Sequence, residues 1–256
     1  MRSDVEILIV GAGPVGLLLA RLLRARGRDC LVIEKRPAAP AYSMAIGITP
    51  PSLEILEGLG LAEEFVSRGV KITDAHIHEN GRYLGRVSFE KIPAAHRFIL
   101  SLPQGETVEI LARGLPVWRG VELTGLQPDA NGVTAQVGER TIRYRYLIGC
   151  DGARSTVRSL AGIPVRTKTY RPRFVMGDFP DDTGWGAEAH LFFSARGAVE
   201  SFPLPGGKRR WIAQTAAPRP SFGHPLPALR GEGWGEGMSD FQPEWQLAEQ
   251  IGRAHV

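Results

Sequence analysis

The sequence predicts an α/β protein with a Rossmann-like parallel sheet, an antiparallel β excursion and the start of a second, β-sheet domain. Three observations support this fold class. The apolar run 5–10 leads into a glycine-rich turn and then into an amphipathic run, which gives the order strand, turn, helix. Short strand-like segments joined by Asn-Gly dipeptides follow in the middle of the chain. Further strand-like segments occupy residues 173–215.

The turn after the first predicted strand has the spacing of a dinucleotide-binding loop. It consists of Gly11, Ala12, Gly13, Pro14, Val15 and Gly16. Gly11 permits the tight turn, Gly13 lets a pyrophosphate approach the backbone, and Gly16 lets the helix pack closely on its strand. The helix, expected from Pro14 to about Arg26, presents amide donors and a positive dipole at its N-terminus. We therefore favour an adenine-dinucleotide site over a purely structural glycine turn.

An acidic residue completes this fingerprint. The next apolar run, 30–33, is expected to be the second strand, and Glu34 closes it about 20 residues after the turn. A carboxylate in this place can accept hydrogen bonds from ribose hydroxyls. A glycine pattern alone is weak evidence, but strand, turn, helix, strand and acid occur here in the required order.

The middle of the chain is expected to contain two helices and then mostly strands. The helices are predicted at 51–60 and 62–67, after an irregular segment rich in Pro, Ala and Ser. Strands at 72–78 and 83–89, joined by the turn Asn80-Gly81, predict an antiparallel layer.

A β meander is expected next. Its strands are predicted at 121–126, 133–137 and 141–146, and an Asn131-Gly132 turn joins the first two. The short apolar run 146–149 then predicts a strand that returns to the centre of the parallel sheet.

A second motif follows that apolar run. Asp151, Gly152 and Arg158 would lie at the carboxyl end of a strand, where open α/β sheets bind ligands. Together with the N-terminal fingerprint, this motif resembles the para-hydroxybenzoate hydroxylase-like flavoprotein monooxygenases, which are single-component FAD-dependent aromatic hydroxylases. The resemblance covers roughly residues 4–217.

The resemblance implies a cofactor, a reaction and a set of binding residues. FAD would be the cofactor and NAD(P)H the transient reductant, in the hydroxylation of an aromatic or similar small molecule through a flavin hydroperoxide. Glu34 would hold the adenosine ribose, Arg36 would lie near the FAD phosphates, and Gln104 would approach the flavin. No catalytic side chain is implied. Beyond the glycine turn, the implied cofactor-binding residues are Glu34, Lys35, Arg36, Gln104, Asp151, Gly152 and Arg158.

The same resemblance divides the chain into domains. It implies an FAD-binding domain over 1–166, including the β meander, and a partial substrate-binding β-sheet domain over 167–217. In the segment 218–238, nine of the 21 residues are Pro or Gly, a composition from which a core is not built. We expect 218–256 to be a low-complexity, non-native tail and the chain to be a fragment truncated at its C-terminus.

Composition excludes several classes of partner. The 31 Lys and Arg residues are scattered among 27 Asp and Glu residues, so a nucleic-acid surface is not indicated. The uncharged run 7–20 is too short to span a bilayer, so no stable membrane insertion is expected. The two cysteines form no close-spaced framework, which is typical of reduced thiols in a cytoplasmic protein.

Two charged or titratable groups are expected to be solvated. Arg21 and Arg24 are placed on the exposed side of the first helix. His76 and His78 alternate along a predicted strand, but no third ligand lies at a plausible spacing. We interpret them as surface imidazoles and expect no metal site.

Other functions share parts of this pattern. A related flavoprotein reductase or halogenase would have the same N-terminal fingerprint. An NAD-dependent dehydrogenase is disfavoured by the motif at Asp151 and Gly152. An inactive, truncated FAD-binding remnant is the non-enzyme alternative. The natural substrate, the preference for NADH or NADPH and the oligomeric state stay open.

Overall fold

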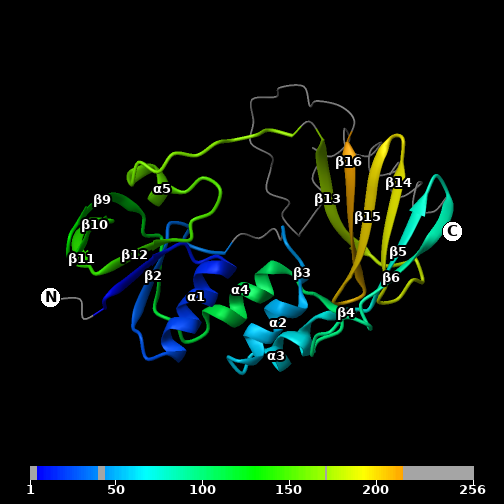
Figure 1. Cartoon of the computed structure of the whole chain (residues 1–256), viewed down its shortest axis with the longest axis horizontal. Coiled ribbons are helices and arrows are strands. Elements are labelled where there is room, and N and C mark those ends of the chain that lie inside the picture. The colour runs from blue at the N-terminus through cyan, green and yellow to red at the C-terminus, as the bar shows by residue number, and fades with distance from the viewer. Residues whose placement is uncertain (1–4, 40–43, 171, 216–256) are drawn as a thin grey trace. The chain divides into compact units, whose positions relative to one another are not determined.

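The structure, a computed structural model, describes residues 5–39, 44–170 and 172–215 (Figure 1). The described residues form two compact units, and each unit combines two stretches of the chain. Unit 1 contains those up to Pro40 and those of 104–168, and unit 2 contains those of 41–103 and from Thr169 onward. The predicted tail, 218–256, lies outside the described residues.

Unit 1 is built on a parallel sheet. Its four strands lie in the order β12-β1-β2-β8. Every residue of β1 and β2 is buried, as expected for inner strands of a parallel sheet. The elements of this layer are β1 (Ile7–Val10), α1 (Pro14–Ala25), β2 (Cys30–Glu34), α4 (Gln104–Ala112), β8 (Val117–Arg119), β12 (Tyr146–Gly149) and α5 (Thr156–Leu160).

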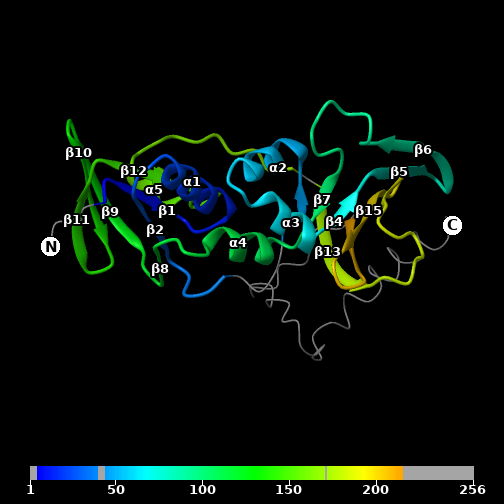
Figure 2. The same cartoon turned by 90° about the horizontal axis from the view of Figure 1, so that it is seen from below.

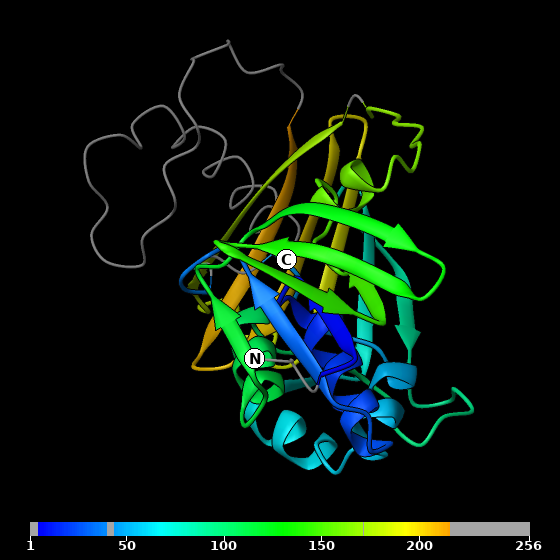
Figure 3. The ribbon, with the colours of Figure 1, turned by 90° about the vertical axis from the view of Figure 1, so that its left-hand side faces the viewer.

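A three-stranded meander forms the second layer of unit 1. It comprises β9 (Leu123–Asp129), β10 (Gly132–Val137) and β11 (Arg140–Tyr144), in the order β11-β10-β9. Figure 3 shows its green strands beside the blue strands of the parallel sheet. Apolar side chains of the meander pack against Leu8, Val10, Leu31 and Ile33, so one core joins the two sheets.

Helices α1 and α4 contact each other in unit 1. The side chain of Arg21 donates to the carbonyl oxygens of Ile110, Leu111 and Arg113, and Arg24 donates to that of Gly114. These bonds satisfy carbonyls that the C-terminus of α4 leaves without helical partners. The prediction that both arginines lie on the exposed side of the helix is therefore right for Arg24, which is exposed, and wrong for Arg21, which is partly buried.

Unit 2 is dominated by a six-stranded sheet in the order β13-β16-β15-β14-β5-β6. All its neighbours are antiparallel except β14 and β5, which run parallel. The strands are β5 (Asp74–Glu79), β6 (Arg82–Ser88), β13 (Arg173–Pro180), β14 (Ala189–Ser194), β15 (Gly197–Leu204) and β16 (Lys208–Thr215).

A small second sheet and two helices complete unit 2. The sheet has the order β3-β7-β4, and Figure 2 shows α2 and α3 next to β4 and β7. These elements are β3 (Gly47–Ile48), α2 (Pro50–Glu57), α3 (Ala62–Arg68), β4 (Val70–Ile72) and β7 (Ile99–Ser101). The two predicted helices are thus confirmed. Among the described residues, no helix is long and apolar enough to cross a membrane.

Both predicted hairpins are confirmed, but an Asn-Gly pair forms the turn in only the first of them. Asn80 and Gly81 have φ of 45° and 83°, the positive values that a tight hairpin turn between two strands requires. The second turn joins β9 and β10 in the predicted meander. The first turn was predictable because few other residue pairs adopt this backbone conformation at low cost. In the second hairpin the turn residues are Ala130 and Asn131, and Gly132 (φ of 153°) already begins β10.

Three strand-level expectations differ from the structure. The run 146–149 forms β12 at an edge of the parallel sheet and not at its centre, and Tyr146 is 51% exposed. The predicted strand 72–78 is two strands, β4 and β5, in different sheets. The sequence predicted two continuous domains divided between 166 and 167, whereas each compact unit combines two separate stretches of the chain. The reason is that β5 pairs with β14 and so brings 41–103 into the unit of the C-terminal strands.

Candidate functional site: a nucleotide cradle at the carboxyl ends of three parallel strands

Two glycines of the turn allow close approach of backbone segments in unit 1. Gly11 has φ of +107°, and a Cβ added there would lie 2.5 Å from the carbonyl oxygen of Cys150. A Cβ on Gly16 would lie 2.0 Å from the carbonyl oxygen of Gly11. Any side chain at Gly16 would push α1 away from the end of β1, so the loop geometry depends on glycine at both positions.

Gly13 differs from these two glycines. A Cβ added there would meet no atom of the chain within 4 Å, so the protein itself does not require glycine at this position. The space beside Gly13 is open to a ligand. Of the three glycines, Gly13 is the one whose small size is not explained by contacts within the chain.

The N-terminus of α1 is left without side-chain partners. Gly13 is its N-cap, no side chain caps it, and its first turn carries no acidic residue. The first amide to bond within the helix is that of Leu17, to the carbonyl of Gly13. The amides of Val15 and Gly16 therefore have no acceptor inside the helix, and together with the helix dipole they favour an anion.

Glu34 lies directly beside this turn. One carboxylate oxygen, Oε2, accepts from the amide of Ala12 at 3.1 Å, and Oε1 accepts from the amide and Nε of Arg36 at 3.0 and 3.2 Å. Burial alone would raise the pKa of Glu34, but these hydrogen bonds outweigh it and the pKa is lowered. Glu34 is thus an ionised acceptor that also holds the turn, while Lys35 and Arg36 are exposed.

The chain after β12 lies against the same turn. The amide of Cys150 donates to the carbonyl of Val10 at 2.7 Å, which continues the parallel pairing past the strand ends. The strand order β12-β1-β2 places β12 and β2 on opposite sides of β1. Ligands of open α/β sheets bind at such a switch point, outside the carboxyl ends of the strands.

Asp151 organises the loop that follows. Its Oδ1 accepts from the hydroxyl of Ser155 at 2.6 Å, and Oδ2 accepts from the amides of Thr156 and Val157 at 2.6 and 3.1 Å. Burial pushes the pKa of Asp151 up, but these bonds outweigh it and lower the pKa. The adjacent Gly152 has φ of +81°, a conformation that favours glycine.

Ser155 is a structural residue that the sequence analysis missed. It is the N-cap of α5, and its Oγ accepts from the amide of Arg158 at 3.0 Å. The guanidinium of Arg158 donates back to the carbonyl of Ala153 at 2.9 Å. The signal was available, because serine is a preferred N-cap residue.

The structure brings most of the predicted residues to one place. The glycine turn, Glu34 and the Asp151 segment meet at the carboxyl ends of β1, β2 and β12. Gln104 is the first residue of α4, a helix that packs on α1, and it is partly buried.

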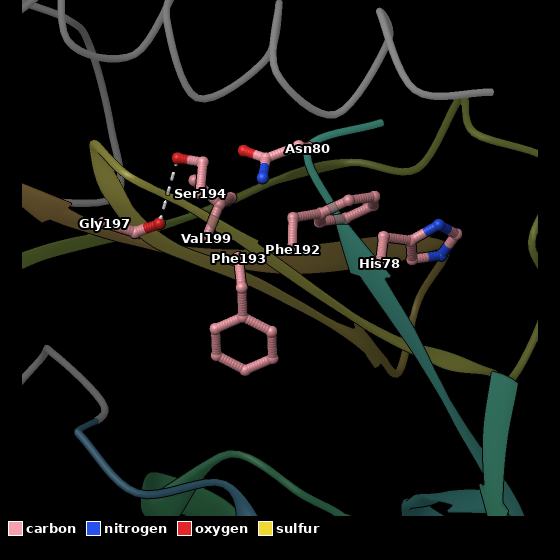
Figure 4. A pocket seen from close by; sticks show the side chains of 7 residues that line it. All are labelled: His78, Asn80, Phe192, Phe193, Ser194, Gly197 and Val199. Carbon is pink, nitrogen blue, oxygen red and sulfur yellow. Dashed lines mark hydrogen bonds between the residues drawn. The ribbon is translucent and has the colours of Figure 1, made fainter. Parts of the chain in front are cut away.

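The surface of the described residues also has two hollows that are not lined by the glycine turn, Glu34 or the Asp151 segment. One, of about 540 Å³, lies along α4 and β8 in unit 1 and includes Ala39, Arg113 and Arg119. The other, in unit 2, holds only about 10 Å³, enough for about one water molecule (Figure 4). An aromatic substrate does not fit the second hollow. The glycine turn, Glu34 and the Asp151 segment form an open surface at the strand ends, called here the shelf. It is recognised by its hydrogen-bond geometry and not by an enclosed volume.

Comparison with known proteins identifies the family of the chain. A family model described as "FAD binding domain" matches residues 4–187, which is more than half of the chain. The chain belongs to this FAD-binding-domain family. The match includes the glycine turn, Glu34 and the Asp151 segment, so the expected cofactor, FAD, is confirmed at the level of the family.

Individual relatives are similar to different shares of the chain. A rifampicin monooxygenase of Streptomyces venezuelae is 35% identical over 181 residues, which are 68% of this chain and 37% of that protein. A pentachlorophenol 4-monooxygenase of Sphingobium chlorophenolicum is 31% identical over 82% of this chain and 42% of its own length. The FAD-binding chain thus spans less than half the length of these curated relatives.

A solved structure shows the same fold. The p-nitrophenol 4-monooxygenase PnpA of Pseudomonas putida superposes with a TM-score of 0.83 over 98% of this chain and 63% of its own, at 20% identity. The predicted α/β fold class is therefore confirmed.

Whether the histidines of the predicted strand 72–78 could hold a metal depends on the side chains around them in the part of the chain that the structure describes. No group of three or more His, Cys, Asp or Glu side chains there is arranged to hold a metal ion. The interpretation of His76 and His78 as surface imidazoles was wrong, however. In unit 2 both are partly buried and stack on other rings, His76 on His190 and His78 on Phe192.

Proposed function

We propose that this chain is the FAD-binding part of an NAD(P)H-dependent flavoprotein monooxygenase that hydroxylates an aromatic or similar small molecule. The observation that carries the proposal is the shelf itself. It combines open space at Gly13, unpaired amides at the start of α1 and an ionised Glu34. The names of the relatives, which are monooxygenases of rifampicin, pentachlorophenol and p-nitrophenol, support the reaction class.

Each part of the shelf is assigned here to a part of FAD. Its amides and helix dipole would hold the pyrophosphate beside Gly13, and Glu34 would accept from the adenosine ribose. The exposed Arg36 would approach the phosphates. Gln104 and the Asp151 loop would contact the rest of the nucleotide. The full proposed set is Gly11, Ala12, Gly13, Pro14, Val15, Gly16, Glu34, Lys35, Arg36, Gln104, Asp151, Gly152 and Arg158.

The protein's own contribution is binding and orientation. The redox chemistry, oxidation of NAD(P)H and activation of dioxygen, is supplied by FAD when it is bound. Glu34 and Asp151 both have lowered pKa values, so they stay ionised and act as fixed hydrogen-bond acceptors and not as proton carriers. The six-stranded sheet of unit 2 would provide substrate contacts between Phe174 and Trp211. We further propose a cytoplasmic location, because both cysteines are unpaired thiols.

The test separates cofactor binding from catalysis. The purified chain is titrated with FAD, and binding is followed by flavin fluorescence. NAD(P)H oxidation is then measured with and without a phenol, and the products are analysed by mass spectrometry under ¹⁸O₂. Incorporation of one ¹⁸O atom into the phenol is expected. FAD binding with a reduced or halogenated product would instead support the reductase or halogenase alternative.

A failure at the first step has a different meaning. If FAD does not bind at all, the proposed shelf residues are wrong in this chain. If FAD binds but no NAD(P)H-dependent oxygenation of any tested aromatic compound occurs, the inactive-remnant alternative is supported.

A further inference from the structure

Three histidines form one cluster on a face of the six-stranded sheet in unit 2. His76 on β5 is directly opposite His190 on β14, and their rings stack with centroids 4.8 Å apart. His78 lies two residues along β5, with Nε2 3.3 Å from Nδ1 of His190. The cluster was not expected from the sequence, because β5 and β14 are separated by more than 100 residues.

His190 is the buried centre of this cluster. It is 6% exposed, and its Nε2 has no hydrogen-bond partner among the described residues. Its ring also stacks on the indole of Trp185, with centroids 3.9 Å apart. An imidazole in this position is shielded from water by Trp185 on the loop that precedes β14.

The loop 181–188, called here the Trp185 loop, is held by one buried cation. Arg209 on β16 is fully buried, and its guanidinium donates to Asp181 Oδ2 at 3.0 Å. It also donates to the carbonyls of Gly186 and Glu188 at 2.8 and 2.9 Å. Both ends of the loop are thereby fixed to the sheet, with Trp185 between them.

Most charged and titratable groups around His190 disfavour its protonation. His76 and His78 face it from β5, and Arg209 faces it from β16. Asp181 from the loop is the one partner that favours the charged form. Two further groups contact His76 and not His190: Glu188 Oε2 lies 3.0 Å from His76 Nε2, and the Tyr83 hydroxyl on β6 lies 3.2 Å from His76 Nδ1.

We propose that the Trp185 loop is an acid-opened cover, which lifts when His190 takes up a proton and exposes the histidine face of the sheet. In the closed loop a proton on His190 would be buried beside Arg209 and two imidazoles. With the loop lifted, water reaches the ring and solvates the charge. This inference is independent of FAD binding and of the proposed reaction.

The pKa of His190 gives the direction and the pH window. Burial, followed by His76, Arg209 and His78, lowers it from 6.5 to about 3 in the closed loop. Above pH 6.5 the ring is neutral in both states, so pH has no effect. Below 6.5 the open state gains a proton that the closed state lacks, so the ratio of open to closed rises up to about tenfold per pH unit.

Protonation of Asp181 would also weaken closure of the Trp185 loop, but at a lower pH. Burial raises its pKa, but hydrogen bonds from Thr183 and the charge of Arg209 outweigh this and lower it. The ion pair with Arg209 therefore weakens only in stronger acid. The first loss of closure on acidification is assigned to His190.

Native-state hydrogen exchange of the full chain tests the cover. Exchange of 181–188 is measured at pH 7.5 and 5.5 and corrected for the intrinsic rate at each pH. The amides of Asp181 and Thr183, bonded to Gly207 and to the Asp181 side chain, report on closure. We expect their protection to fall about tenfold at pH 5.5, while the strands β1 and β16 keep theirs.

Three variants locate the effect. His190→Phe keeps a ring against Trp185 and should remove the pH dependence. His96→Phe, a control outside the cluster, should retain it. His76→Gln removes one imidazole that lowers the pKa of His190 in the closed loop, so the acid effect should be unchanged at pH 5.5 and level off at a higher pH than in the wild type on further acidification. Equal protection of the wild-type loop at both pH values, an unchanged effect in His190→Phe, or an equal fall in β16 each overturns the proposal. The hydrogen-exchange measurement on the wild-type chain still tests the proposal if His190→Phe fails to fold.

Discussion

At the scale of single residues, the FAD shelf depends on what each glycine touches. Gly11 and Gly16 are required by the chain itself, because backbone oxygens lie where their Cβ atoms would be. Gly13 is not, because its Cβ would meet open space. The three glycines of one motif therefore separate into two that the fold requires and one that it does not.

This difference predicts opposite behaviour of two matched variants. Gly16→Ala should lower the free energy of unfolding by about 1–3 kcal/mol, since overpacking of a close contact forces backbone shifts. Gly13→Ala should leave the unfolding free energy almost unchanged and weaken FAD binding. Urea unfolding and flavin-fluorescence titration measure the two effects. Unchanged FAD affinity in Gly13→Ala would contradict the placement of the pyrophosphate.

Glu34 makes a second prediction at this scale. Because its pKa is lowered in the fold, it contributes stability above its ordinary pKa of 4.5, and that contribution is lost as pH falls through the lowered value. Glu34→Gln should therefore flatten the acid limb of stability against pH and weaken FAD binding. Urea unfolding between pH 7 and 3 checks this, with the exposed Glu139→Gln as control. Identical curves for Glu34→Gln and wild type would refute it.

At the scale of elements, the loop after β12 is held by caps and by the packing of one half-buried side chain, Val157, against the core of unit 1. Asp151 accepts from two amides of α5 and from Ser155, and Ser155 in turn caps the amide of Arg158. No residue of α5 is fully buried, and Val157 is the side chain of α5 that packs against the core. These hydrogen bonds therefore add substantially to the stability of the short helix.

Removal of the cap should release the helix. Asp151→Ala leaves two amides without acceptors, and we expect a loss of about 1–3 kcal/mol in the local opening free energy of 155–160. Asp151→Asn, which keeps one acceptor oxygen, should recover part of it. Hydrogen exchange of this segment is the measurement. Normal protection in Asp151→Ala would mean that the cap does not hold α5.

At the scale of the whole molecule, the FAD shelf and the histidine cluster belong to different compact units. The shelf lies wholly in unit 1 and the cluster wholly in unit 2. Ligand binding stabilises the folded state of the unit that binds it.

We therefore expect FAD to protect unit 1 directly. At a concentration of 100 times its Kd, FAD should raise the free energy of unfolding by about 2.7 kcal/mol. Hydrogen exchange in β1 and β2 provides the readout, with a Gly13→Ala chain at the same FAD concentration as the control. Unchanged exchange in both strands at saturating FAD would show that the cofactor does not bind at the shelf.

Local patterns in the sequence predicted much of this molecule. The glycine turn with Glu34, both hairpins and the helices α1, α2 and α3 were all predictable. Each depends on residues close together in the chain, where backbone preference and spacing are sufficient. The family resemblance added FAD, which the family match confirms.

The sequence by itself thus determined the fold class, the nucleotide fingerprint and the short-range turns, because these follow from neighbouring residues. Only the tertiary structure decided the edge position of β12, the pairing of β5 with β14 and the bonds from Arg21 to the end of α4. It also decided the burial of His190 among His76, His78 and Trp185. The physical reason is common to all four: each depends on which distant segments pair, and a strand's own residues do not encode its partner.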